Sequence, residues 1–243
     1  MIYKARLGQA SYGEAIGILL LDCFTPFIPG DVANATTYNF PVRFHKVEGL
    51  TTKRVLRKDP TAFEPLLAAA EELVGQGVKA ITGDCGFLAI HQRRLAMALE
   101  VPVFLSSLLQ IPFIFSILGP DQKVGVITAD SKSLDEALLE AAGVKSGERL
   151  VIRGMEDREN FSKAVIEETG VLDSEKAKME AVSVASEIVE KEQELRALLL
   201  ECSCLPPYAS AIQKAVELPV FDYVTMINYV HSTLFRDSFE GQI

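Results

Sequence analysis

The chain has 243 residues, of which 49% are hydrophobic and 23% charged, a composition that fits one large or two modest α/β domains and argues against disorder. The formal net charge of -9 comes without a lysine or arginine cluster, so we expect a small-molecule ligand and neither nucleic acid nor a membrane surface as partner. Residues 1–15 lack the apolar core of a signal peptide, and the apolar run that follows is too short to span a bilayer, which predicts a cytoplasmic protein.

Short apolar runs predict buried parallel strands, in chain order over 15–22, 78–84, 101–106, 123–129, 149–154, 195–201 and 218–223. Amphipathic stretches predict the helices between them, over 60–77, 88–100, 133–143 and 175–195, and a closing helix within 224–243. A strand followed by a helix, repeated along the chain, is typical of a doubly wound parallel sheet. We therefore expect an α/β fold.

An internal repeat divides the chain into two parts. Residues 77–104 match residues 194–221 at an offset of 117, with eight identical positions that include Cys85 and Cys202. A second match, between 15–22 and 123–130, has an offset of 108, and the difference is absorbed by loop length. The repeat predicts two copies of one α/β unit that face each other across a pseudo-twofold axis.

The expected domains follow from this repeat. An N-terminal domain over 1–117 would carry Cys85, and a C-terminal domain over 118–222 would carry Cys202. Residues 223–243 are expected to form a helix that packs back on the N-terminal domain or on a partner subunit of a homo-oligomer.

The two cysteines lie where an apolar strand ends and a helix begins, the edge at which open α/β sheets bind ligands. Inverting a stereocentre next to a carboxylate requires a base on one face of the carbon and an acid on the other. Two thiols can supply both, since the ordinary thiol pKa is about 8.5. Core filling is the alternative for a single cysteine, but it does not explain a duplicated one. The pattern predicts Cys85 and Cys202 as the catalytic pair.

The segments GDCGFLAIHQ and ECSCLPPYA resemble the two cysteine motifs of the aspartate, glutamate and hydantoin racemase family, and LDCFTPFIPGDVANATTYNFPV resembles its N-terminal segment. The resemblance implies two flavodoxin-like domains with the site in the cleft between them, and it implies no pyridoxal phosphate, other cofactor or metal. It places Cys85 and Cys202 at the catalytic positions and Ser203 at a substrate-binding hydroxyl. The implied activity is that of an isomerase, a cofactor-independent racemase or epimerase of an amino acid or amino-acid derivative.

Polar groups at the strand ends and turns are candidate substrate contacts, namely Asp22, Asn34, Gly86, Phe87, Ser106, Ser107, Thr128 and Ser203. Asp84 and Glu201 immediately precede the cysteines. Because neighbouring side chains on a strand point to opposite faces, we expect these two carboxylates to hold the turns or lie behind the site. Phe27 stands where this subgroup of the family has an arginine, a departure that bears on recognition of a distal carboxylate.

Two other interpretations stay open. The first is a decarboxylase or a cis-trans isomerase of a small dicarboxylate on the same scaffold. The second is a small-carboxylate binding module without catalysis, because two lobes around a cleft also describe solute-binding proteins. The pair of matched thiols favours racemisation over both, since neither alternative needs two thiols at equivalent positions.

Overall fold

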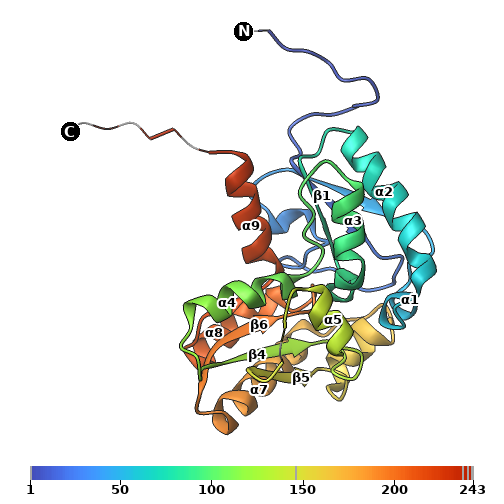
Figure 1. Ribbon diagram of the computed structural model, residues 1–243. Helices are drawn as coiled ribbons and strands as arrows, with labels where there is room; N and C mark the ends of the chain where they lie inside the picture. Colours follow the sequence, from blue (N-terminus) through green and yellow to red (C-terminus); the bar gives the residue numbers. More distant parts are fainter. Residues whose placement is uncertain (1, 146, 237, 240, 242–243) are drawn as a thin grey trace.

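The structure is a computed structural model, and it describes residues 2–145, 147–236, 238, 239 and 241. Two parallel sheets follow one another along the chain, each with helices packed around it (Figure 1). The predicted α/β class with two parallel-sheet units is confirmed. Among the described residues no helix is long and apolar enough to cross a membrane.

The N-terminal sheet has the strand order β2-β1-β3, formed by β1 (Ile16–Leu20), β2 (Val42–Lys46) and β3 (Ala80–Gly83). All three strands run parallel, and Val103 extends the sheet by a single parallel bridge to Ile81. The central strand β1 is almost wholly buried, as the apolar run predicted. Its neighbour β2 is only half-buried, because it forms the edge of the sheet.

The C-terminal sheet repeats this arrangement in the order β5-β4-β6-β7. Its strands are β4 (Lys123–Thr128), β5 (Leu150–Gly154), β6 (Leu195–Leu200) and β7 (Val220–Phe221), and all pair in parallel. In both sheets the second strand in chain order lies outside the first, as in flavodoxin-like sheets.

The two sheets share the same register. Ile16 pairs with Ala80 in the first sheet, and Val124 pairs with Ala197 in the second, positions related by the offsets of 108 and 117. The residues before the two cysteines also match, since Asp84 N–H donates to the Leu19 carbonyl and Glu201 N–H donates to the Ile127 carbonyl. The two halves that match in sequence therefore also match in their backbone hydrogen bonds. The boundaries at 117 and 222 remain predictions.

The predicted helices are present but shorter than expected: α2 (Phe63–Gly75), α3 (Gln92–Ala98) after a 3-10 turn at Gly86–His91, α5 (Glu136–Ala141) and α7 (Ser174–Lys191). The sequence analysis did not predict β2, α1 (Thr52–Leu56), α4 (Ile111–Ile117), α6 (Glu159–Phe161) or the π-helical turn Ser162–Ile166, and it gave no range for the helix after Cys202, which is α8 (Ala209–Val216). The strand expected over 101–106 is reduced to the bridge at Val103.

The last helix, α9 (Tyr223–Leu234), lies against the N-terminal sheet although it follows the C-terminal one (Figure 1). Its buried residues Tyr223 and Ile227 share an apolar cluster with Ile16 and Ile18 of β1. The Tyr223 hydroxyl donates to the Leu105 carbonyl at 2.7 Å. Part of the helix expected within 224–243 falls on residues 237, 240, 242 and 243, which lie outside the described residues.

Candidate active site

A pocket lies where the carboxyl ends of both sheets meet. Its wall is formed by the turns after β1, β3, β4 and β6, together with side chains from α1 and from the π-helical turn. Parallel strands place their carboxyl ends at one edge, so the two sheets contribute equivalent turns to a single cavity.

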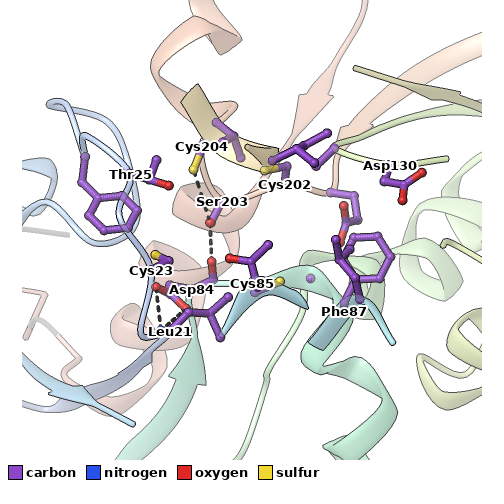
Figure 2. A pocket seen from close by; sticks show the side chains of 18 residues that line it. Leu21, Cys23, Thr25, Asp84, Cys85, Phe87, Asp130, Cys202, Ser203 and Cys204 are labelled. Carbon is purple, nitrogen blue, oxygen red and sulfur yellow. Dashed lines mark hydrogen bonds between the residues drawn. The ribbon is translucent and has the colours of Figure 1, made fainter. Parts of the chain in front are cut away.

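Cys85 and Cys202 enter this pocket from the N-terminal and the C-terminal half, respectively (Figure 2). Each begins the same turn, in which the cysteine carbonyl accepts the N–H three residues later, Leu88 after Cys85 and Leu205 after Cys202. Burial, followed by the nearby charges of Glu201 and Asp84, holds the pKa of Cys85 well above its ordinary value. The Phe87 N–H opposes this rise by hydrogen bonding to the sulfur.

Asp84 and Glu201 both line the pocket, whereas the sequence analysis expected them to hold the turns or to lie behind the site; Asp84 also holds the turn after β1, because it accepts the Leu21 N–H. The Leu21 N–H lies 3.0 and 3.1 Å from the two oxygens of Asp84, and the equivalent N–H of the other sheet, that of Ala129 108 residues later, opposes the rise in the pKa of Glu201. Burial raises the pKa of Asp84 to about 8 and that of Glu201 to about 7. Strand alternation does not decide the side on which these two carboxyls lie, because β3 and β6 end one residue before them.

Gly86 leaves the space that the Glu201 carboxyl occupies. A Cβ built on Gly86 would collide with Glu201 Oε1 and lie 2.5 Å from its Cδ. A glycine is therefore required after the first cysteine for a steric reason. The sequence analysis predicted Gly86 only as a substrate contact.

Ser203 and Phe87, both predicted, also line the pocket. The Ser203 hydroxyl donates to the Asp84 carbonyl, and it links the two cysteine turns across the halves (Figure 2). The chain after β1 adds a second link, since Val32 N–H donates to the Ser203 carbonyl at 3.4 Å.

Five other predicted contacts lie outside the pocket wall, and internal contacts occupy their side chains. Asp22 pairs with Lys46 at 3.2 Å, and Asn34 caps the following turn. Ser106 accepts the Leu108 N–H. Ser107 donates to carbonyls at the end of β6, and Thr128 donates to Glu201 Oε2 at 2.7 Å. The last two therefore act beneath the pocket by holding its wall.

The structure also places in the wall residues that the sequence analysis did not select as substrate contacts: Leu21, Cys23, Thr25, Phe27, Thr52, Leu56, Ala129, Asp130, Val165, Ile166 and Cys204. The match between 15–22 and 123–130 could have indicated Asp130. No local pattern marks Val165 or Ile166, which belong to a π-helical turn, a feature frequent at functional sites.

In its described residues, the wall of the pocket contains acidic side chains but no basic ones. It contains Asp84, Asp130 and Glu201, and among its described residues there is no lysine, arginine or histidine. The wall includes Phe27, which stands where the resembling subgroup of the racemase family has an arginine. Among the described residues, no group of three or more histidine, cysteine or acidic side chains could hold a metal ion.

Solved structures that share this fold include a racemase and a decarboxylase. Allantoin racemase from Pseudomonas fluorescens superposes with a TM-score of 0.61 at 18% identity, and the match covers 90% of each chain. A mutant arylmalonate decarboxylase superposes with a TM-score of 0.57 at 16% identity, over 91% of this chain and 94% of the other. At such identities the likeness shows the fold, so the resemblance to the racemase family holds for the scaffold.

The curated proteins that resemble this chain in sequence are lyases. No protein-family model matches the chain. Dimethylsulfoniopropionate lyase 5 of Emiliania huxleyi is 33% identical over 228 residues, 90% of this chain but 45% of that protein. The dimethylsulfoniopropionate lyase of Durusdinium sp. clade D is 30% identical over 222 residues, 88% of this chain and 73% of the other. The predicted isomerase, an amino-acid racemase, is therefore wrong. The chain belongs to the family of the dimethylsulfoniopropionate lyases.

Proposed function

We propose that this chain is a lyase that cleaves dimethylsulfoniopropionate by β-elimination. The substrate carries a carboxylate at one end and a dimethylsulfonium cation at the other, two carbons away. Removing a proton from the carbon next to the carboxylate lets the bond between the β-carbon and sulfur break. The products are dimethyl sulfide, acrylate and one proton, so atoms and charge balance. The function of the relatives supports this reaction.

The proton to be removed lies next to a carboxylate, as in the racemisation that the thiol pair first suggested. Cys85 and Cys202 lie on opposite sides of one pocket, so a small substrate between them presents its α-carbon to both. One of the two cysteines, as its thiolate, acts as the base and becomes a thiol when it takes the proton. The sulfide leaves as a neutral molecule and needs no acid, so elimination requires only one of the two thiols to transfer a proton.

The observation that carries the proposal is the charge around Cys85. Its pKa is raised by burial and by two carboxyl groups, and no basic side chain of the described wall opposes them. A positive charge nearby would favour the thiolate, and a second carboxylate would disfavour it. A substrate whose single carboxylate is balanced by its own cation therefore fits this pocket better than aspartate or glutamate, in which two carboxylates outnumber one ammonium group.

The test is release of dimethyl sulfide from dimethylsulfoniopropionate, measured in the headspace by gas chromatography, with acrylate measured in solution. We expect wild type to release both products in equal amounts. Replacing the basic thiol, in Cys85→Ser or Cys202→Ser, should lower kcat by about 10²-fold or more, the usual contribution of a general base.

Cys23→Ser is the matched control, because Cys23 is a thiol of the same wall whose pKa is also raised by burial, to about 12. We expect this variant to keep most of the activity. Folded wild-type protein that releases no dimethyl sulfide would show the proposal to be wrong, as would two cysteine variants that both react at the wild-type rate.

A further inference from the structure

The Glu201 carboxyl is fully buried just after β6 and has an oxygen without a hydrogen-bonding partner. Oε2 accepts the Thr128 hydroxyl at 2.7 Å. Oε1 has no partner among the described residues, and it lies over Gly86 in the pocket wall, where a Cβ would collide with it. A buried acceptor without a partner carries a desolvation cost, which a ligand in the pocket could remove.

Among the described residues of the wall, the other two carboxyls already accept hydrogen bonds through both oxygens. Both oxygens of Asp84 lie within hydrogen-bonding distance of the Leu21 N–H, at 3.0 and 3.1 Å. Asp130 accepts from the Lys132 N–H and the Ser133 hydroxyl at the start of its own loop. Glu201 is therefore the wall carboxyl with an oxygen left for a ligand.

The surroundings of Glu201 favour a cationic ligand. The described wall offers no basic side chain to balance the carboxylate, and it includes the aromatic rings of Phe27 and Phe87, which can attract a cation through their faces. An onium group, in which methyl groups surround a charged sulfur or nitrogen, needs a nearby negative charge rather than hydrogen-bond acceptors.

We propose that Glu201 is the counter-ion of the substrate's onium group and makes the pocket selective for onium carboxylates. The inference rests on the proposed function, because it names the group of that substrate which this carboxylate receives. Asp84, with its oxygens held by a backbone N–H, does not share this role.

In the proposed reaction, the charge of Glu201 can be neutralised both before and after the substrate loses its cation. Burial raises the pKa of Glu201 to about 7, and an onium cation beside it would favour its charged form. When the sulfide departs, the positive charge passes to the proton taken from the α-carbon. A carboxyl with a pKa near neutrality can be charged while the cation is bound and protonated after it has left.

Two ligands of the same shape test the inference by isothermal titration calorimetry. In 3-(trimethylammonio)propionate a charged nitrogen stands where 4,4-dimethylpentanoate has a neutral carbon, and neither can release a sulfide. We expect wild type to bind the cationic ligand about tenfold or more tightly than the neutral one, since a buried charge pair contributes at least that much. Glu201→Gln should bring the ratio close to one while it retains binding of the neutral ligand, which also reports a folded pocket.

Asp84→Asn is the matched control, because it removes a second, equally buried carboxyl, and it should keep the ratio of wild type. Glu201→Ala removes the charge independently if the glutamine variant does not fold. A ratio that survives in the Glu201 variants, or that is absent in wild type, would overturn the inference. Release of dimethyl sulfide is measured separately, so a protein that eliminates but shows no dependence on Glu201 refutes only the counter-ion. A protein that selects the cation through Glu201 but releases no sulfide refutes only the lyase.

Discussion

Replacing Gly86 with alanine should destabilise the protein because the new methyl group has no room. Its Cβ would lie 2.5 Å from Glu201 Cδ and 2.8 Å from the Glu201 carbonyl oxygen, and closer still to Oε1. Overpacking of this kind costs about 1–3 kcal/mol. Moving the carboxyl away would also break its hydrogen bond from Thr128, worth about 1.5–3 kcal/mol for a charged group.

Together these contributions give a loss of about 2.5–6 kcal/mol, which for a chain of this size lowers Tm by at least about 5 °C. The measurement is thermal unfolding followed by circular dichroism. Gly75→Ala is the control, since a Cβ at Gly75, the last residue of α2, meets nothing within 4 Å. We expect that substitution to leave Tm unchanged or slightly raised.

A double-mutant cycle isolates the cause. In a Glu201→Ala background the carboxyl is gone, so Gly86→Ala should cost clearly less than it does in wild type. If Gly86→Ala melts within about 2 °C of wild type, or costs the same in both backgrounds, the methyl group does not displace the carboxyl and the steric explanation of Gly86 fails.

Three further outcomes follow from the structure. Burial raises the pKa of Asp84 to about 8, so its contribution to stability is complete below pH ~4 and is lost as the pH rises toward 8. Tm should therefore fall less between pH 5 and 8.5 in Asp84→Asn than in wild type, and equal slopes would contradict the raised pKa. Tyr223→Phe leaves the Leu105 carbonyl without its donor and should cost about 1–3 kcal/mol in urea unfolding, whereas an unchanged midpoint would show that water replaces the bond. Gly30→Ala, strained at φ +99° and with its Cβ 2.9 Å from Pro207 Cα, should lower Tm by several degrees in the same melting assay, and a neutral result would mean that this loop moves freely.

The repeat in the sequence predicted the architecture because each copy contains its own hydrogen-bonding pattern. Two offsets, 108 and 117, reproduce the strand register and the turns that carry Cys85 and Cys202. Apolar runs record burial on both faces of a strand, so the central strands β1, β4 and β6 were found. Strand β2 was missed because an edge strand with Arg43, His45 and Lys46 lacks such a run.

The activity did not follow from the thiol pair. Racemisation and β-elimination both begin with loss of a proton next to a carboxylate, so two cysteines at equivalent positions are compatible with either. What separates the two reactions is the group on the neighbouring carbon, and under the proposed function the rest of the wall recognises that group. The departure at Phe27 was a sign of this difference in the sequence itself.

The sequence by itself therefore determined the two α/β units, the equivalence of their cysteines and the edge of the sheets at which those cysteines lie. Only the tertiary structure decided the contents of the wall: Val165 and Ile166 from a distant turn, the absence of basic side chains among its described residues, and the free oxygen of Glu201 over Gly86. The reason is physical. Periodicity along the chain reports which side chains are buried, whereas the charge and shape of a pocket depend on segments that meet only when the two halves pack together.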